Sequence, residues 1–543
     1  MHEFDYVIVG GGSAGCVLAA RLSEDPAISV CLLEAGGTGN SQIVNVPMGM
    51  VAMMPTRLNN WSLQTVAQPG LNGRVGYQPR GKMLGGSSGL NAMVYIRGHR
   101  WDYDHWAELG NLGWSYDEVL PYFIRSENNE TLRDHFHGQG GPLNVAELRT
   151  DNPFQQHYLD AAKQAGFALT RDFNGEQQEG VGIYQATQKN GERCSAARAY
   201  LHPQIHRANL SVITAASARR VLFAEKRAIG VEYSKGGQIR QVHARCEVLL
   251  SAGAFQSPQL LMLSGVGDSA QLRQVGIEPL HHLPGVGQNL QDHPDFVFIY
   301  KAKSHSLFGL SLLGSLRMLK EFWRYLTGRR GMLTSNVAEG GAFLKTDSAL
   351  PAPDVQLHFA TALVENHART IRLGHGYSCH VCLLRPKSRG SVKLRSANPD
   401  DTPLIDPNFF GESEDLETMV KGFKLTRQIM NAPALAERRV AELHTENVHS
   451  DEQIRQILRE RSDTVYHPVG TCMMGQGPLA VVDAELRVHG LQGLRVVDAS
   501  VMPTLIGGNT NAPSMMIGEK AADLIRTSYT AAYSRTSISQ SLA

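Results

Sequence analysis

The chain shows little imbalance of charge and no long apolar run, and each absence excludes a class of protein. Its 543 residues contain 52 Lys and Arg against 51 Asp and Glu, a net charge of +1, so there is no basic excess of the kind that nucleic-acid binders carry. No stretch of 18 or more apolar residues offers a membrane-spanning helix. The first strand-like run begins by residue 5, which leaves no room for a signal peptide. We expect a cytoplasmic protein, or one held peripherally at the inner membrane, without a nucleic-acid partner.

Cysteine is also scarce, with seven residues that are odd in number and scattered. Such usage is typical of reduced thiols rather than of a disulfide framework. Cys379-x-x-Cys382 is the one close pair. It lies in an apolar, strand-like run without a second pair, so we interpret it as packing rather than as a metal or redox site. The sequence predicts no metal centre.

The N-terminal stretch has the order of elements found in a dinucleotide site. The apolar run 6–9 is typical of a strand buried on both faces of a parallel sheet. It leads through Gly10-x-Gly12-x-x-Gly15 into a helix, where the glycines let backbone approach a pyrophosphate at the helix N-terminus. A second strand, 30–33, ends in Glu34, roughly 20 residues beyond the glycines, where a carboxylate binds ribose hydroxyls. The same site could arise by chance in an ordinary βαβ turn, but all five elements in order favour the dinucleotide.

The length predicts more than one domain, because 543 residues exceed what one hydrophobic core supports. The glycine/serine turn within 80–98 leads into a segment interpreted as helix and offers a second place for phosphate or a flavin ring. Strands at 220–223, 228–233 and 247–251 indicate a meander inserted in a doubly wound domain. Ser257 before Pro258 predicts the N-cap of a helix over 259–264.

The C-terminal half shows β-rich alternation from 355 to 395, which is typical of an antiparallel sheet on the substrate side. Helices are predicted over 413–436 and 450–462. The Ser/Thr/Ala-rich tail after about residue 528 is predicted to fray.

Residues 304–331 combine leucines and aromatics with five arginines and lysines at helical spacing. Two interpretations stay open. The segment is either an interfacial membrane helix or a helix packed on the core with a solvated basic face.

Near the C-terminus, His467 lies in a Pro/Gly loop, and a strand ending in Asp498 is followed by a small-residue loop that contains Asn511. An imidazole can accept a proton near neutrality, and an amide can donate a hydrogen bond to a developing alkoxide without titrating. Together they could take the hydroxyl proton of an alcohol while hydride leaves its carbon. A lone histidine in such a loop is otherwise structural.

With these residues in view, the chain resembles the glucose–methanol–choline (GMC) oxidoreductases from about residue 4 to 527. Three motifs carry the resemblance beyond the N-terminal glycines. The first is Gly81-Lys82-x-Leu84-Gly85-Gly86-Ser87-Ser88-x-Leu90-Asn91, and the second runs from Gly253 to Gly267. The third joins His467-Pro468 to Asn511-Ala512-Pro513 and looks like the family's catalytic His–Asn pair.

The resemblance implies an α/β fold with a Rossmann-like FAD-binding domain of the GMC and glutathione-reductase type. A second, substrate-binding domain is implied, built on an antiparallel sheet flanked by helices. The segments 1–155, 195–300 and 466–528 would form the FAD-binding domain, 156–194 and 301–465 the substrate domain, and 529–543 a flexible tail.

The resemblance also assigns site residues. His467 would be the base and Asn511 its partner on the substrate oxygen, with Glu339 as a further substrate residue. The residues implied at the cofactor are Gly10, Gly12, Ser13, Ala14, Gly15, Glu34, Ala35, Trp61, Arg80, Gly81, Met83, Leu84, Gly85, Gly86, Ser87, Asn91, Ala92, Met93, Val94, Val221, Ala252, Gly253, Tyr466, Asp498, Ala499, Asn509, Ala512 and Pro513.

Two positions qualify the resemblance. Some relatives attach FAD through a histidine where this chain has Leu90, so we expect a non-covalent flavin. Glu339 looks like the glutamate that choline-oxidising relatives use against the ammonium group, but it also occurs in alcohol-oxidising relatives. No aromatic cage accompanies it in the sequence.

The leading hypothesis is an FAD-dependent alcohol dehydrogenase. It would oxidise primary aliphatic or aromatic alcohols to aldehydes by hydride transfer to flavin N5, with His467 as base and a quinone-type electron acceptor. Alternatives are a choline dehydrogenase and an alcohol oxidase that uses O2. A hydroxynitrile lyase is more distant, His467 argues against a light-driven decarboxylase, and a nicotinamide enzyme would leave both flavin motifs without a purpose.

Overall fold

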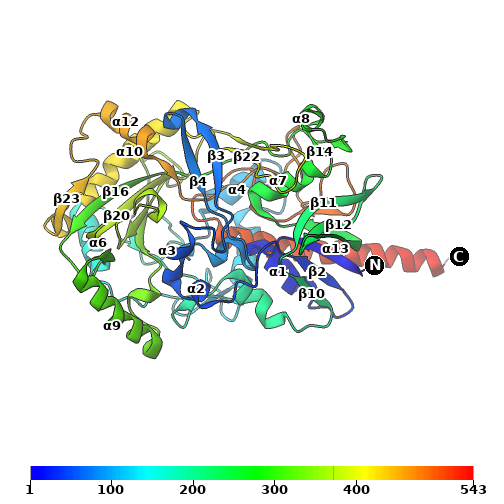
Figure 1. Cartoon of the computed structure of the whole chain (residues 1–543), viewed down its shortest axis with the longest axis horizontal. Coiled ribbons are helices and arrows are strands. Elements are labelled where there is room, and N and C mark those ends of the chain that lie inside the picture. The colour runs from blue at the N-terminus through cyan, green and yellow to red at the C-terminus, as the bar shows by residue number, and fades with distance from the viewer. Residues whose placement is uncertain (1, 371, 542–543) are drawn as a thin grey trace.

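The computed structural model describes residues 2–370 and 372–541 and contains two large sheets (Figure 1). The first is a seven-stranded sheet, in which β10 (Leu210–Ile213), β2 (Val30–Leu33), β1 (His2–Val9) and β13 (Gln238–Leu250) pair in that order and in parallel. The antiparallel strands β12 (Arg227–Lys235) and β11 (Ser217–Ala224) extend one side, and β25 (Leu494–Val496) pairs with β13. The predicted meander and parallel core are therefore present.

The core of this sheet follows from the apolar N-terminal strands. Every residue of β2 and the run 5–9 of β1 are buried. Helices cover the sheet, so β2 and the buried run of β1 carry no polar alternation. One of these is α1 (Ser13–Leu22), which packs against α13 (Asn511–Ser541). The chain ends meet here, since the first and last helices lie side by side.

The second sheet has eight strands. Its order is β23 (Arg439–Leu443), β16 (Pro294–Ala302), β20 (Gly374–Leu383), β19 (Val355–Ala360), β18 (Ala338–Leu344) and β7 (Gly180–Ile183), and all these pairs are antiparallel. The short strands β17 (Gly309–Leu310) and β24 (Asp463–Thr464) join it. Helices α6 (Pro153–Gln164), α10 (Ser413–Met430) and α12 (Asp451–Arg461) pack on or beside it. This is the antiparallel sheet flanked by helices that the sequence analysis expects, although the expected boundary at residue 300 falls inside β16.

Smaller elements connect the two sheets. A four-stranded sheet contains β21 (Ser391–Lys393), β22 (Leu404–Asp406), β3 (Leu63–Gln68) and β4 (Arg74–Gln78). Three two-stranded sheets pair β5 (Glu127–Asn129) with β6 (Leu143–Val145), β8 (Gln188–Lys189) with β9 (Glu192–Arg193), and β14 (Val266–Gly267) with β15 (His281–His282). Six further α-helices are α2 (Gln42–Asn45), α3 (Met50–Met53), α4 (Arg100–Glu108), α5 (Tyr116–Ser126), α8 (Ser269–Gln274) and α11 (Pro433–Ala436).

Two predicted helices differ in the structure. Helix α7 (Gly253–Leu263) begins before Ser257, so the predicted N-cap is wrong. Pro258 is tolerated inside it because the hydroxyl of Thr471 donates to the carbonyl of Ala254, the group that lacks a helical partner at a proline (2.6 Å). The predicted helix 413–436 is split into α10 and α11 by Ala432, which has an extended backbone before Pro433.

The glycine/serine turn does not lead into a helix as predicted. Only a 3₁₀ turn forms (Gly86–Gly89), and the chain beyond it is irregular, with an isolated β-bridge from Val94 to Ala186. Gly85 and Gly86 both have positive φ (92° and 51°), and a Cβ on Gly86 would lie 2.7 Å from the Cα of Gly12. The two glycine-rich loops therefore press against each other, which needs the absence of a side chain.

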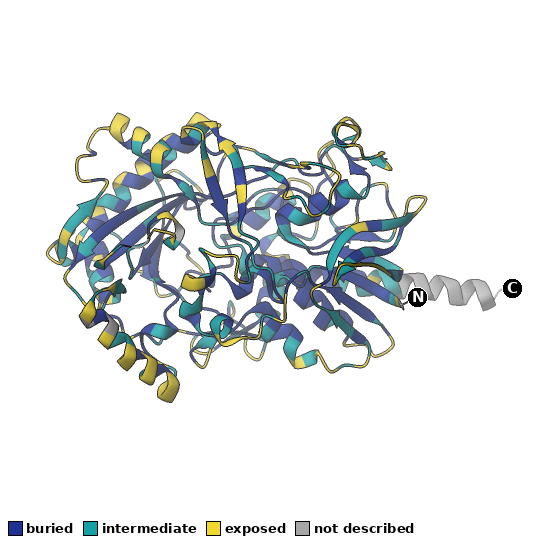
Figure 2. Ribbon diagram, in the orientation of Figure 1, coloured by how far each residue is buried: buried dark blue, intermediate teal, exposed yellow. Residues whose placement is uncertain are grey.

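Helix α9 (Leu312–Gly328) lies within 304–331, and its apolar side chains are mostly exposed. Leu312, Leu319 and Trp323 are 82%, 63% and 66% exposed, whereas Glu321 and Tyr325 face the protein. The apolar stripe therefore points outward. Figure 2 shows the exposed face of α9 at the lower left of the molecule.

Helix α13 runs as far as Ser541 and so enters the segment 529–543 that is predicted to fray. Residues 542 and 543 lie outside the described chain, and the fraying stays a prediction. Among the described residues, no helix has both the length and the apolar run needed to cross a bilayer.

Candidate active site

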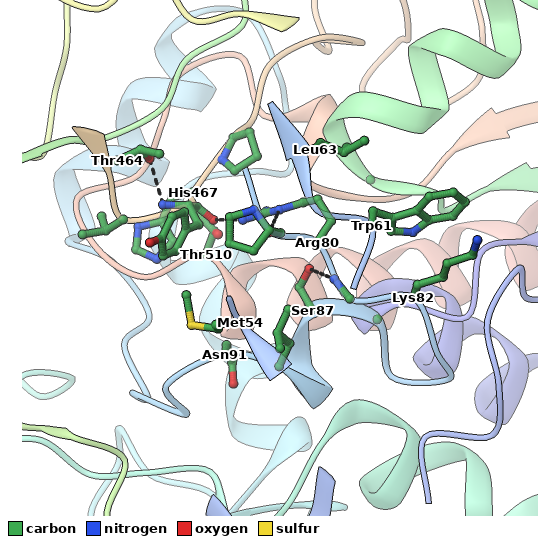
Figure 3. Close-up of a pocket in the computed structure, with 18 of the residues that line it drawn as sticks. Met54, Trp61, Leu63, Arg80, Lys82, Ser87, Asn91, Thr464, His467 and Thr510 are labelled. Atoms are coloured by element: carbon green, nitrogen blue, oxygen red, sulfur yellow. Dashed lines mark hydrogen bonds between the residues drawn. The ribbon is translucent and has the colours of Figure 1, made fainter. Parts of the chain in front are cut away.

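A cavity of about 1010 Å³ lies where the two sheets meet. From the first sheet it is lined by the carboxyl ends of β1, β2 and β13, and from the second by residues of β16 and β19. In open parallel sheets ligands bind at the carboxyl ends of the strands, so this is the expected place for a dinucleotide. The close-up in Figure 3 shows the side chain of Arg80 extending toward His467, whereas Trp61 lies on the other side of Arg80.

The dinucleotide end of the cavity is the N-terminus of α1. Its N-cap is Gly12, which has no side chain to cap the helix, and Ser13 and Ala14 line the cavity. The first N–H groups of a helix lack partners within the helix and attract anions. Gly15 does not line the cavity; a Cβ there would lie 1.9 Å from the carbonyl oxygen of Gly10. These features fit the pyrophosphate of FAD.

Glu34 lies in the cavity wall as predicted. Its carboxyl accepts hydrogen bonds from the N–H groups of Gly36 (2.7 Å) and Gly11 (2.9 Å). Burial nevertheless raises the pKa of this carboxyl to about 7. The backbone bonds fix its orientation and leave lone pairs for ribose hydroxyls.

The predicted cofactor residues divide into two groups. Those that line the cavity are Gly10, Gly12, Ser13, Ala14, Glu34, Ala35, Trp61, Arg80, Gly81, Gly86, Ser87, Asn91, Ala92, Met93, Val94, Ala252, Gly253, Tyr466, Asp498, Ala499 and Asn509. Those that do not are Gly15, Met83, Leu84, Gly85, Val221, Ala512 and Pro513.

The position of Val221 contradicts its predicted contact with adenine. Its N–H donates to Ser264 (2.8 Å), and the chain lines the cavity earlier, at Ala216 to Ala218. The nearest lining residue of this segment, Ala218, precedes Val221 by three residues on β11.

Asp498 lines the cavity and also caps a helix. Its carboxylate accepts from the N–H of Gly253 (2.9 Å) and from the hydroxyl of Ser257 (2.6 Å), so it caps α7 from a distant part of the chain. Burial raises its pKa despite these bonds. An acidic side chain at a helix N-terminus is stabilised by the helix dipole.

Arg193 supports the cavity wall at Asn91 and was missed in the sequence. It is 1% exposed, and its guanidinium donates to the carbonyls of Val44, Ser88 and Asn91 and to Oδ1 of Asn91 (2.7 to 3.2 Å). Asn91 lines the cavity. A single arginine after a turn carries no signal that it will be buried, so only the tertiary structure reveals this contact.

His467 lies in the cavity wall, 9% exposed, with each ring nitrogen next to a side-chain partner. Nδ1 is 3.0 Å from Nδ1 of His293, and Nε2 is 3.3 Å from Nδ2 of Asn509. Burial, followed by His293, His358 and Arg80, holds the pKa of His467 well below its usual range. The imidazole is therefore neutral and able to accept a proton.

The predicted pairing of His467 with Asn511 is contradicted. Asn511 is the first residue of α13, and its Oδ1 accepts from the hydroxyl of Ser13 (2.8 Å). Asn509, which was placed among the cofactor residues, is the amide beside His467. The two asparagines are two residues apart in one loop, so spacing from His467 does not distinguish them.

Asp292 and His293 were not singled out in the sequence, although both belong to the site. Oδ1 of Asp292 accepts from the backbone N–H of His293 (2.9 Å) and of His467 (2.7 Å). One carboxyl thus anchors both histidines. An Asp-His pair next to a β-strand was the available signal, but nothing in the sequence connects it with a residue 174 positions away.

Glu339 lies outside the cavity, which contradicts a direct contact with substrate. Its carboxyl is fully buried and accepts from Ser335 (2.6 Å), Gln155 (2.9 Å) and Thr150 (3.2 Å). Its neighbour Ala338 lines the cavity. Successive side chains of a strand point to opposite faces, so Glu339 faces away.

Comparison with known proteins agrees with this geometry. Models of the GMC oxidoreductase family match residues 4–295 and 386–518. An alcohol dehydrogenase [acceptor] of Pseudomonas putida is 47% identical over 526 residues (96% of this chain, 95% of the relative), and the human mitochondrial choline dehydrogenase is 45% identical over 538 (96% and 90%). The crystal structure of a pyridoxine 4-oxidase from Mesorbium loti superposes with a TM-score of 0.86 at 33% identity, covering 96% of this chain and 98% of that one. The chain belongs to the GMC oxidoreductase family, whose members are flavin enzymes acting on CH–OH donors.

Proposed function

We propose that this enzyme oxidises primary aliphatic or aromatic alcohols to aldehydes, with FAD bound non-covalently and a quinone-type electron acceptor. The observation that carries the proposal is the pair of Nε2 of His467 and Nδ2 of Asn509 in the cavity wall. The relative named alcohol dehydrogenase [acceptor] supports an alcohol substrate and a separate electron acceptor. Leu90, with no nucleophilic atom, supports a flavin without a covalent bond.

In the proposed reaction, the cofactor and two side chains each have one role. FAD, when bound, supplies the acceptor for the hydride that leaves the alcohol carbon. Nε2 of His467 takes the hydroxyl proton, so the alcohol loses one hydride and one proton and becomes an aldehyde. Nδ2 of Asn509 donates a hydrogen bond to the oxygen while negative charge develops on it. We propose that the segments of the seven-stranded sheet hold FAD and those of the eight-stranded sheet hold the substrate.

The cavity wall supports an apolar substrate over choline. Met50, Met54, Phe308 and Val337 line it, and Glu339, the predicted partner of an ammonium group, lies outside it. An apolar wall binds an alkyl or aryl chain by burial. Of the carboxylates in the wall, Asp295 pairs with His380 and Glu365 with Arg372.

The decisive test is anaerobic stopped-flow bleaching of the flavin by 1-butanol, 1-octanol, benzyl alcohol and choline, followed by re-oxidation with air or a soluble quinone. We expect octanol and benzyl alcohol to bleach fastest and quinone to re-oxidise faster than air. Bleaching by choline alone would replace the proposal with a choline dehydrogenase. Faster re-oxidation by air would indicate an oxidase, and no bleaching by any alcohol would favour a lyase.

We also propose peripheral contact with an anionic membrane through 304–331. The outward stripe of α9 contains Leu312, Leu316, Leu319, Phe322, Trp323 and Leu326. The single acidic residue of 304–331, Glu321, is buried, so the exposed charges of this segment are all cationic. A second copy docked on this stripe would bring like charges together, whereas anionic lipid complements them. Leu310 is also exposed and forms a β-bridge with Leu373. Phe308, two residues before Leu310, lines the cavity.

Vesicle binding tests this surface separately from catalysis. We expect the wild type to sediment with vesicles of phosphatidylglycerol and phosphatidylcholine but not with phosphatidylcholine alone. The double variant L319S/W323S should lose at least tenfold in vesicle affinity while its bleaching by 1-butanol is unchanged. The matched control is L112S, at a leucine that is 81% exposed elsewhere. Equal binding by all three proteins, or loss of a dimer in L319S/W323S, would contradict the membrane contact.

A further inference from the structure

We propose that His293 is a positioning residue that holds His467 in the tautomer able to act as a base. This inference rests on the proposed function, in which Nε2 of His467 accepts the substrate proton. Two separate chains of hydrogen bonds support it. Each begins at a backbone carbonyl, which can only accept, and each ends at a different nitrogen of the same imidazole.

The first chain begins at the carbonyl of Leu384. That oxygen lies 3.0 Å from Nε2 of His293, so Nε2 of His293 must carry the hydrogen. Burial lowers the pKa of His293 to about 3, and the ring is neutral. Its Nδ1 is then a lone pair, 3.0 Å from Nδ1 of His467, which must donate. Nε2 of His467 is left without a hydrogen.

The second chain begins at the carbonyl of Leu357, which accepts from the hydroxyl of Tyr184 (2.6 Å). The oxygen of Tyr184 has used its hydrogen and can only accept, so the side-chain atom of Gln356 at 3.0 Å is its amide nitrogen. The same nitrogen donates to the amide of Asn509 (3.0 Å), whose accepting atom is therefore Oδ1. Nδ2 of Asn509 is then the atom facing His467.

This second chain ends at the same conclusion as the first. Nδ2 of Asn509 can only donate, so Nε2 of His467, at 3.3 Å, is a lone pair. A reversed orientation at any step would place two donors or two acceptors against each other. The carbonyls of Leu357, on β19, and of Leu384, at the end of β20, thus both require the tautomer of His467 that has its hydrogen on Nδ1.

The surroundings show why the acceptor on His293 matters during proton transfer. The groups that face His467 are His293, His358 and Arg80, and they disfavour a positive charge on it, as does burial. The carboxyl of Asp292 is committed to the backbone N–H groups of both histidines. Nδ1 of His293 is therefore the group that accepts from the imidazolium as it forms.

Two substitutions at His293 separate this role from a structural one. Oδ1 of an asparagine occupies the position of Nδ1 and keeps an acceptor toward His467. A glutamine instead places its amide near the position of Nε2 and keeps the donor toward Leu384. We expect H293N to reduce its flavin with an alcohol within about tenfold of the wild type, and H293Q to be slower by about 10²-fold.

The spectroscopic readout does not depend on turnover. In protein labelled with ¹⁵N-histidine, the signals of His467, identified by their loss in H467A, should show a protonated Nδ1 and an unprotonated Nε2. H293N should retain this pattern and H293Q should show a mixture of tautomers. This measurement on the wild type alone decides the case if neither variant folds.

Two results would overturn the inference. One is an unprotonated Nδ1 on His467 in the wild type. The other is an equal loss in H293N and H293Q, which would indicate packing alone. A failure of the proposed function is visible separately, because H467A would then be reduced by alcohol as fast as the wild type whatever the tautomer.

Discussion

Replacing His467 with alanine is expected to slow the reduction of the bound flavin by alcohol about 10²–10⁴-fold, the range over which a positioned general base contributes. The imidazole is buried in the cavity wall, and Nε2 is its nitrogen nearest the Asn509 amide. His358, whose pKa burial lowers to about 3, also lines the cavity next to Asn509, so this variant tests which of the two imidazoles is the base. The measurement is the anaerobic stopped-flow rate with 1-octanol.

The matched control is H206A, at an exposed histidine outside the cavity, which should leave the rate unchanged. FAD content should be the same in both variants, because His467 faces the substrate end. A flavin reduction rate in H467A within threefold of the wild type would remove His467 from the chemistry.

The lowered pKa of His467 adds a pH dependence with a definite sign. The imidazole is the base when it is neutral, and its pKa lies well below 6.5. In the wild type, kcat/KM should therefore stay level as the pH falls through 6.5, and should decrease only at a lower pH, where the ring is protonated. A decrease centred at pH 6.5 would indicate a solvated histidine instead.

Replacing Gly15 with alanine is expected to abolish FAD retention. A Cβ there would lie 1.9 Å from the carbonyl of Gly10, closer than any backbone contact allows. The obstruction is backbone, which cannot rotate away, so the loop beneath the pyrophosphate must move. The measurement is the ratio of flavin to protein absorbance after purification. Acid precipitation of the wild type should release yellow FAD into the supernatant, as a non-covalent flavin requires.

G37A is the control for this substitution. Gly37 lies in the loop after Glu34, and a Cβ there would meet no atom within 4 Å. The control should keep its full FAD content and its Tm. FAD bound normally by G15A would show that the close approach of Gly15 to Gly10 does not hold the site together, and a yellow acid pellet from the wild type would contradict the non-covalent bond.

The sequence alone determined the features that depend on local order along the chain. The strand, glycines, helix and Glu34 of the N-terminus require only neighbouring residues, and the structure places them together at the carboxyl ends of β1 and β2. The antiparallel alternation of the second sheet is local in the same way. His467 was identified because three motifs occur in order and because an imidazole in a Pro/Gly loop is chemically distinctive.

The tertiary structure decided everything that depends on which of several similar residues faces the cavity. The side chain of Asn509 points toward His467, whereas that of Asn511 points toward Ser13. Glu339 is excluded from the cavity by the alternation of side chains along β18, whose register is set by pairing with β19. The stripe of α9 has the same periodicity whether it points inward or outward, so only the packing of Tyr325 and Glu321 shows that it points outward. His293 reaches His467 across 174 residues, a distance over which no sequence pattern acts. Local pattern sets the elements, but the direction of a side chain is set by contacts between them.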